Sequence, residues 1–569
     1  MSTVSTGSSG LTFKQWLILT VAAIGFLFDT YELLMLPVIA APALSELLGV
    51  PPSNPLVREW LGIMLWSAAV CGGVFGLMGG WLIDRFGRKT VMVGSILMYS
   101  ISPVLAAFST SALMLLIFRC TTFIGVCVEF VAAITWLAEL FPDKRMRELA
   151  LGWTQAFASV GGLLVTAANQ LSITYADQLP GLPIAEPLDG NASWRFTLIT
   201  GLIPGFLILL LLPFVPESQV WLERKRAGTL RRPSFGALFT PELRRVTFVT
   251  AILSACAYAA AFGALQLTPT QIVPGLPTLE EQQKQLKPLQ DEAKALNIKL
   301  NEQKPKVDEY VQSVPGLREV VDARVIVRRD LRKIGEKMDK APEDQKAAIK
   351  ASSDEIARTR LKPLTDKLNE VTKDKPEAKQ AVLDWEGTLR EIGINRGKQK
   401  KPDDEVKEKG NTMQFWQEMG GLTGRILLAL GLVYIASRRL LLRIFQLPGL
   451  FIFPLTYWYL YRDQPDIFVV GIFLCGLMTV AQFSYMGEYL PKVFPLHLRG
   501  LGASFATNVG GRMCGTSAAL LTTTIIAPRL SGNTFIQVAT AAAIVGTSVY
   551  ALGLIAAMFL PEPKEETPS

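Results

Sequence analysis

The 569-residue chain contains one histidine, His497, and its six cysteines include no Cys-x-x-Cys pair. Histidine and cysteine are the usual protein ligands of zinc, so a protein-held metal is not expected. Neither a phosphate-binding glycine loop nor a nucleophile with a neighbouring base is evident, so the sequence predicts no enzyme and no cofactor. The cysteines fall in or at apolar segments, where packing is their expected role.

Charge is also scarce, since charged residues make up 19% of the chain and hydrophobic residues 50%. Apolar runs longer than about 18 residues recur and predict membrane-spanning helices. The first run lacks a small-residue cleavage site, so we expect it to be retained. The sequence thus predicts an all-α, multi-pass protein of the lipid bilayer. Twelve segments are expected, at residues 14–40, 61–83, 90–109, 112–139, 149–171, 194–216, 245–267, 420–436, 445–461, 466–489, 500–527 and 534–560.

Lysine and arginine are concentrated in alternate short loops, near residues 85–89, 144–147, 224–232 and 438–443. Because cations are retained on the cytoplasmic side during insertion, we expect both termini to be cytoplasmic. The formal net charge of +8 follows from this topology. It therefore requires no nucleic-acid partner.

A hydrophilic stretch, residues 268–418, separates the seventh and eighth segments, and the topology places it outside the cytoplasm. Leucine and alanine recur in it at helical spacing, which predicts helical hairpins or a short coiled coil. A partly disordered charged loop is the alternative. We expect its helices to be interrupted near Pro305, Pro315, Pro342, Pro363 and Pro376.

Three motifs carry a resemblance to a known family. Residues 79–89 read GGWLIDRFGRK and resemble the cytoplasmic loop between helices 2 and 3 of the major facilitator superfamily. Residues 119–129, RCTTFIGVCVE, followed by ELFP at 139–142, are similar to helix 4 of its sugar-porter-like and metabolite:proton symporter branches. PESQVWL at 216–222 is similar to the motif after helix 6. The resemblance implies a secondary transporter with two six-helix bundles.

An internal repeat agrees with two related halves. FPDKR at 141–145 is echoed by FPLHLR at 494–499, and Val-Gly-Gly follows each, at 160–162 and 509–511, where it suits close helix packing. The expected parts are an N-terminal bundle (1–216), a cytoplasmic linker (217–244), helix 7 (245–267), the extracytoplasmic insertion (268–418) and helices 8–12 (419–569). The expected location is a bacterial inner (plasma) membrane.

Ionisable residues inside a membrane are costly and therefore informative. Asp29 and Glu32 lie three residues apart on helix 1, on neighbouring positions of one face. The pair resembles the Asp-x-x-Asp of organic-acid:proton symporters. A carboxylate in a partly dry cavity can load and release a proton, so we expect Asp29 to be a proton carrier and Glu32 a second one. Helix–helix hydrogen bonding is the alternative role.

Arg119 and Glu129 are about 15 Å apart along helix 4, so each needs a partner elsewhere. The resemblance implies that Arg119 lies near Asp29 and influences its protonation, although its planar fork also suits a substrate carboxylate. Arg512 on helix 11 is either a second anion site or an interhelical salt bridge. Neutral polar residues can line the cavity or hold helices together. The expected substrate-binding residues are Arg119, Glu129, Gln155, Asn169, Gln482 and Arg512.

The loop at 79–89 has an expected gating role. Asp84 can face the positive end of a helix from the other bundle, and the cations can pair with acids across the seam while the inside is closed. Pure topology determination is the alternative, but it explains only the cations. The expected gating residues are Gly80, Asp84, Arg85, Gly87, Arg88 and Lys89.

The function implied is proton-coupled import of a small organic acid or related metabolite by alternating access. A sugar or other solute uniporter or symporter, an exporter, and a transport-inactive receptor signalling through the insertion are the alternatives. The expected partners are the solute, protons and lipid. The stretches 328–333 and 403–405 are dense in charge, so an extracytoplasmic protein partner that binds the insertion is a further expectation. We expect the insertion to have a docking or capping role.

Overall fold

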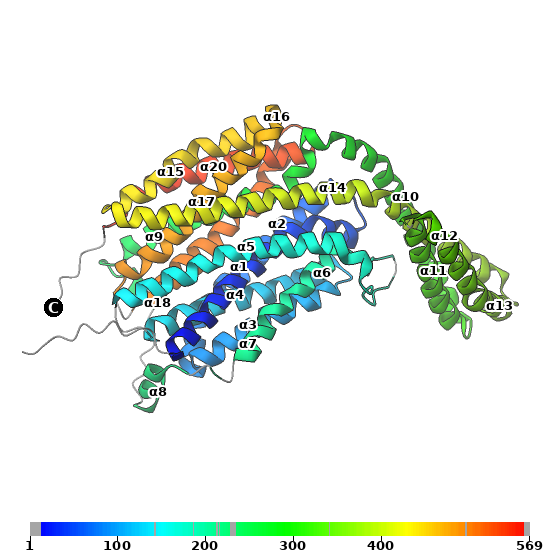
Figure 1. The fold of residues 1–569 in the computed structure, drawn as a ribbon, viewed down its shortest axis with the longest axis horizontal. Coiled ribbons are helices and arrows are strands. Elements are labelled where there is room, and N and C mark those ends of the chain that lie inside the picture. The colour runs from blue at the N-terminus through cyan, green and yellow to red at the C-terminus, as the bar shows by residue number, and fades with distance from the viewer. Residues whose placement is uncertain are drawn as a thin grey trace, which may run out of the picture.

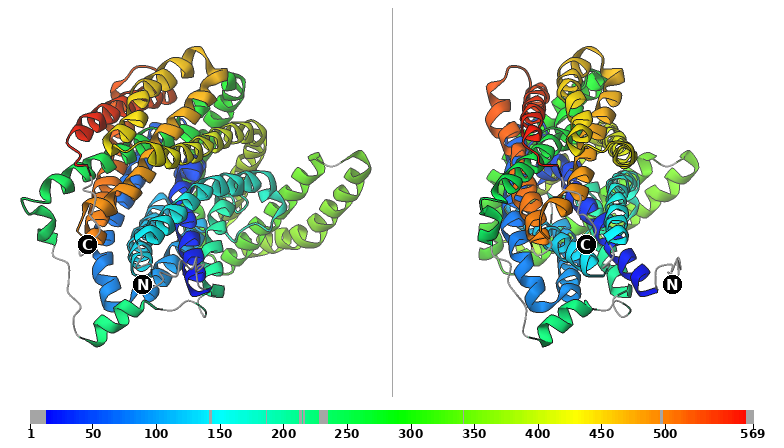
Figure 2. Two further views of the ribbon diagram at one scale, coloured as in Figure 1. Left: turned by 60° about the vertical axis from the view of Figure 1, so that its left-hand side comes forward. Right: turned by 90° about the vertical axis from the view of Figure 1, so that its left-hand side faces the viewer.

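The structure is a computed structural model that describes residues 13–562 apart from 141–143, 186, 212, 213, 215, 216, 228–234, 341, 496 and 497. Two bundles of long helices lie side by side, and a group of hydrophilic helices extends from one end (Figures 1 and 2). Among the described residues, nine helices are long and apolar enough to cross a membrane. The chain is therefore an integral, multi-pass membrane protein.

The N-terminal bundle holds helices 1–6. They are α1 (Phe13–Leu48), α2 (Pro55–Phe86), α3 (Arg88–Ala107), α4 (Ala112–Leu140), α5 (Lys144–Tyr175), and α6 (Ser193–Ile199) continued by α7 (Ile203–Leu211). A short helix, α8 (Gln219–Arg226), lies in the linker.

The C-terminal bundle holds helices 7–12. Helix 7 is α9 (Arg244–Gly263) with its continuation to Gly275, and helix 8 is the end of α14 (Pro376–Tyr434). Helix 9 is α15 (Arg438–Pro454) extended through α16 (Tyr461–Asp463), helix 10 is α17 (Phe468–Val493), and helix 12 is α20 (Thr534–Met558). Helix 11, residues 499–526, comprises α18 (Arg499–Ser504), α19 (Ala518–Leu520) and wide helical turns.

Helices 5, 8 and 11 are not among the nine that are long and apolar enough over their described residues to cross a membrane. They nevertheless pack inside the bundles, α5 against α1, α14 against α17, and helix 11 against α9. Helix 11 carries Asn508 and Arg512, and α5 carries Asn169 and Gln170. Their polar residues face other helices, which lowers the mean apolarity without exposing charge to lipid. With these three the predicted twelve-helix, two-bundle fold is confirmed.

Small residues allow the helices to approach closely, as the Val-Gly-Gly repeat predicted. A Cβ atom at Gly161 would lie 2.0 Å from the carbonyl oxygen of Leu27 on α1, and one at Gly510 would lie 2.4 Å from that of Ala251 on α9. Backbone contact of this kind requires glycine. The same mechanism operates between the bundles, where a Cβ atom at Gly73 of α2 would lie 2.6 Å from the Cβ of Met513 on helix 11.

The insertion is helical. Its helices are α10 (Glu280–Ser313), α11 (Leu317–Lys340), α12 (Glu343–Ile356), α13 (Lys362–Val371) and the first part of α14. α10 packs along α14, and α11–α13 form the far end (Figure 1). A core that includes Leu317, Val320, Leu368 and Val382 holds the far end together. Burial of these apolar side chains explains why the charged segment is ordered as helices.

Two boundaries differ from the expectation. Pro305 was expected to interrupt a helix but lies inside α10, which is supported along its length by α14. Pro315 lies in a turn, and Pro376 begins a helix. The insertion was expected to end at residue 418, but α14 continues without a break into helix 8. Gln414, Gln417 and Glu418, just before Met419, are buried, although composition suggested a solvated segment there.

Candidate functional site

An ion pair between the two bundles forms the centre of the site. Nη2 of Arg512 on helix 11 donates to Oδ2 of Asp29 on α1 over 2.8 Å, and the side chains are 3% and 8% exposed. The Arg512 guanidinium also lies over the Phe130 ring, 4.9 Å from its centroid. A charge pair this deeply buried is strongly coupled, because removal of one partner strands the other.

Glu129 of α4 is the third charged group at this centre. Its carboxylate lies against Gly25 of α1, where a Cβ would be 2.4 Å from Oε1. It interacts electrostatically with both Asp29 and Arg512. Neither of its oxygens has a hydrogen-bond partner among the described residues. Two carboxylates therefore share one guanidinium, and the charges balance when one carboxyl group holds a proton.

Arg119 does not pair with Asp29 as the resemblance implied. Its guanidinium donates to the carbonyl oxygens of Glu32 (2.7 Å) and Leu33 (3.0 Å) on α1. Pro37 lies four residues after Leu33 and has no N–H for that carbonyl. Arg119 thus satisfies a backbone group that the proline leaves free, and it supports α1 at this point.

Glu32 points into the N-terminal bundle. Its carboxylate borders a cavity of about 20 Å³ that is also lined by Pro103, Leu115, Arg119 and Leu198, enough for one water molecule. Arg119 attracts it electrostatically. Asp29 and Glu32 therefore diverge. Residues three apart on an α-helix point about 60° apart, so one can face the seam while the other faces the bundle interior.

A second polar group on helices 7 and 8 was not predicted. The Glu418 carboxylate accepts hydrogen bonds from Gln414 (2.7 Å) and Gln417 (3.1 Å) and lies against Gly162 of α5. The neighbouring Gly161 contacts α1 at Leu27, so Glu418 lies near the level of Asp29. The apolar run of helix 8 begins only at residue 420, so Glu418 was assigned from the sequence to the hydrophilic insertion. The glycines at 420, 421 and 424 could have indicated that this part of the chain packs closely against other helices.

Several buried amide oxygens of helices 7 and 8 have no hydrogen-bond partner among the described residues. They belong to Gln266, Gln414 and Gln417, which interact with Glu418, and to Gln271, and each side chain is at most 4% exposed. Unpaired buried acceptors and donors are costly, so they indicate a site that a polar molecule or water completes.

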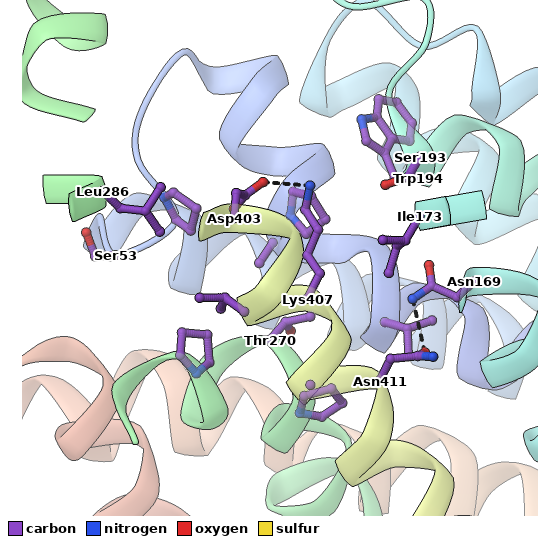
Figure 3. A pocket seen from close by; sticks show the side chains of 18 of the residues that line it. Ser53, Asn169, Ile173, Ser193, Trp194, Thr270, Leu286, Asp403, Lys407 and Asn411 are labelled. Carbon is purple, nitrogen blue, oxygen red and sulfur yellow. Dashed lines mark hydrogen bonds and ion pairs between the residues drawn. The ribbon is translucent and has the colours of Figure 1, made fainter. Parts of the chain in front are cut away.

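The end of the seam beside the insertion is closed in this structure. Thr270 of helix 7 donates to the carbonyl oxygen of Pro37 on α1 over 3.1 Å, and Arg58 of α2 donates to Gln537 of α20 over 2.9 Å. Beside these contacts lies a cavity of about 60 Å³ that α14 lines with Asp403, Lys407 and Asn411 (Figure 3).

Of the predicted polar residues, Asn169 faces this seam and Gln482 does not. Asn169 of α5 donates to Asn411 of α14 over 3.1 Å, which links the bundles (Figure 3). Gln482 accepts from Gln446 of helix 9 over 3.3 Å, inside the C-terminal bundle. Gln482 therefore holds helices together, the alternative role. The side chain of Gln155 lies outside the described residues.

The predicted gating residues make their described contacts within the N-terminal bundle. Arg88 pairs with Glu139 of α4 at 2.8 Å, and Glu217 accepts from the backbone N–H groups of Arg88 and Lys89. Gly87 has φ +98° and touches Glu217, so a glycine is required at this turn. These contacts stabilise the N-terminal end of α3. They differ from the pairing across the seam that we expected.

The other gating residues add little to this picture. The Arg85 guanidinium lies over the Trp81 ring of the same helix, 5.4 Å from its centroid. The backbone of Gly80 and Asp84 belongs to α2, but the side chain of Asp84 and the surroundings of Gly80 lie outside the described residues.

A sequence model of the Major Facilitator Superfamily matches residues 20–286, which include Asp29, Arg119 and Glu129. The fold agrees over the remainder of the chain. A crystal structure of a D-xylose-proton symporter superposes with a TM-score of 0.54 over 98% of this chain and 100% of that one, at 17% identity. This chain thus resembles the major facilitator superfamily in sequence over residues 20–286 and shares the fold of one of its solved structures.

The curated relatives described next are membrane transporters. A sialic acid transporter of Escherichia coli is 25% identical over 46% of this chain and 56% of its own length. An arabinose-proton symporter of Bacillus subtilis is 27% identical over 38% of this chain and 40% of its own. The chain spans about half the length of the curated relatives it matches.

We predict that Asp29 and Arg512 are energetically coupled. Asp29→Asn and Arg512→Gln should each lower the unfolding temperature of the purified protein, because each leaves a buried charge unpaired. The loss of unfolding free energy in the double variant should be smaller than the sum of the two single losses, by about 1–3 kcal/mol. Thermal unfolding in detergent measures this. The exposed pair Asp330–Arg360 is the control, and strictly additive losses at Asp29 and Arg512 would contradict the coupling.

Proposed function

We propose that this protein is a proton-coupled importer of a small organic acid or related metabolite. The observation that carries the proposal is the buried ion pair between Asp29 and Arg512, which joins the two bundles. Arg512 has a planar fork suited to a carboxylate, but Asp29 occupies it. An anionic solute therefore competes with Asp29 for the same guanidinium.

A proton on Asp29 removes this competition. The neutral carboxyl group no longer holds Arg512, so the guanidinium becomes free to bind the solute carboxylate. Loss of the proton on the cytoplasmic side restores the ion pair and displaces the solute. Binding of proton and solute is thus favourably linked, which is the thermodynamic requirement for symport. Glu129 beside the pair and Glu32 in its own cavity are secondary proton sites.

Transport of a sugar is the second candidate. It is favoured by the buried amides of Gln266, Gln271, Gln414 and Gln417, which suit hydroxyl groups, and by the arabinose-proton symporter among the relatives. We assign Arg512 and Asn169 to the solute path and Arg119 to the support of α1. Because exposed cations follow the cytoplasmic loops, we propose a bacterial inner membrane with both termini inside.

The insertion does not need a protein partner to explain its charges. Arg328 pairs with Glu386 at 2.9 Å, Lys333 donates to Asn191, and Asp403 pairs with Lys407 at 2.6 Å. The stretches expected to recognise a partner are thus used largely within the chain. An extracytoplasmic partner would have to use the far end, α11–α13.

Asp29→Asn should abolish solute accumulation driven by an imposed pH gradient and should preserve solute exchange, because the amide mimics the protonated carboxyl group. Uptake into proteoliposomes with sialic acid, a simple aromatic carboxylate and arabinose tests both candidates. Asp466→Asn, at an exposed turn, is the matched control. Undiminished gradient-driven accumulation by Asp29→Asn would refute the coupling role, and accumulation of arabinose alone would favour the sugar.

We also propose that the turn at residues 79–89 contributes to closure of the cytoplasmic face. Asp84→Asn should weaken closure and shift the population inward, with insertion into the membrane unchanged because the cations remain. The labelling rate of a cysteine introduced on the cytoplasmic side of the path should rise about threefold, a change of less than one hydrogen bond. Equal labelling of parent and variant would show that the loop sets topology only.

A further inference from the structure

The insertion belongs to the C-terminal bundle by its chain connections. α10 follows helix 7 after a short turn, and α14 runs unbroken into helix 8. Its polar side chains nevertheless contact the N-terminal bundle. They bind the loop between α5 and α6, residues 176–192, which we name the outer loop. The insertion therefore connects the two bundles on the extracytoplasmic side.

Three contacts join the insertion to the outer loop. Lys400 forms an ion pair with Asp177, and Arg396, one turn earlier on α14, donates to the carbonyl oxygen of Pro187 over 2.6 Å. Lys333 of α11 donates to Asn191 over 2.6 Å. The contacts thus come from two different helices of the insertion, which fixes its orientation on the loop.

The outer loop is firmly held on its own bundle. The backbone N–H of Asp189 donates to Glu46 at the end of α1 over 2.7 Å, and Glu46 pairs with the buried Arg195 of α6 at 3.0 Å. Trp194 donates to the same carboxylate over 2.7 Å. A force on the outer loop is therefore transmitted to helices 1 and 6.

The charges across this contact are complementary. Burial opposes ionisation of Asp189, but Arg396, the Asn191 N–H, Arg332 and Lys400 outweigh it and lower the pKa of this carboxyl group below its usual range. Asp189 lies 3.9 Å from Arg396. The outer loop thus presents two acidic side chains, Asp177 and Asp189, to a cluster of cations on the insertion.

These contacts lie far from the polar centre near Glu418, so rotation of the bundles about that centre displaces them strongly. Arg396 precedes Glu418 by about six turns of α14, roughly 33 Å by the helical rise. If the bundles rock about the polar centre near Glu418, separation grows with distance from it. The insertion contacts then move farther than any contact inside the membrane, and they have to break when the outer side opens.

We propose that the insertion is an outer strap that holds the extracytoplasmic ends of the bundles together and must release the outer loop before the transporter faces outward. The inference rests on the alternating access of the proposed function. It gives the insertion a part in the conformational cycle in place of partner docking. The strap favours the outward-closed state seen here, in which Thr270 meets the carbonyl of Pro37.

Accessibility of the outer cavity tests the strap without any need for transport. Ala41 lines this cavity and is 4% exposed, so Ala41→Cys reports its opening. Addition of Lys400→Glu, which faces Asp177, should raise the labelling rate by a membrane-impermeant thiol reagent about fivefold, the factor that one ion pair provides. Mass spectrometry of the peptide around residue 41 separates this label from the native cysteines.

Charge exchange provides the matched rescue. Asp177→Lys combined with Lys400→Glu restores an ion pair of opposite polarity and should return labelling to within about twofold of the Ala41→Cys parent. Arg360→Glu breaks an exposed pair with Asp330 inside the insertion and should leave labelling unchanged. Unchanged labelling in Lys400→Glu, or an increase that the exchange does not reverse, would overturn the proposal.

A reversible cross-link gives a second, independent result. Cysteines at positions 177 and 400, joined by a reductant-cleavable bifunctional thiol reagent, should hold Ala41→Cys at its low labelling rate, and cleavage of the cross-link should raise labelling about fivefold, as in Lys400→Glu. Labelling that is equal before and after cleavage would overturn the strap. Failure of the proposed proton coupling would not affect this readout.

Discussion

The ion pair between Asp29 and Arg512 is the interaction on which the rest of the structure depends. Charges removed from water must be paired, and these two come from opposite bundles. Their pairing requires helices 1, 4 and 11 to meet at one level, and the small residues of those helices make this possible. Gly25 of helix 1 admits Glu129, and Gly73 of the neighbouring helix 2 admits Met513 of helix 11. The pair is therefore a structural link between the bundles, and we propose that protonation of Asp29 breaks it.

Much of the fold could be predicted from the sequence because hydropathy and the positive-inside pattern act locally. Twelve segments follow from them, whereas the two bundles follow from the family resemblance and the internal repeat. Gln414, Gln417 and Glu418 lie just before the expected start of helix 8 and are polar and yet buried. Hydropathy cannot distinguish a polar residue in water from one paired inside a bundle. The burial of this polar group could therefore not be predicted.

The site could be predicted only in part. Asp29 and Arg512 were identified separately, because intramembrane charge is rare, but their pairing joins residues 483 positions apart. Local sequence cannot give such a contact. Arg119 was assigned to Asp29 by resemblance, whereas Pro37 leaves a carbonyl that attracts it to Leu33. A proline four residues after a carbonyl was the signal that could have indicated this role.

The central claim is that proton and carboxylate solute bind together because Asp29 and the solute compete for Arg512. Proton exchange on solute binding tests it most directly. In weakly buffered detergent solution near neutral pH, saturation of the purified protein with a transported carboxylate should take up about one proton per protein, and Asp29→Asn should take up none. Solute binding by the parent protein without proton uptake, or equal uptake by Asp29→Asn, would contradict the account.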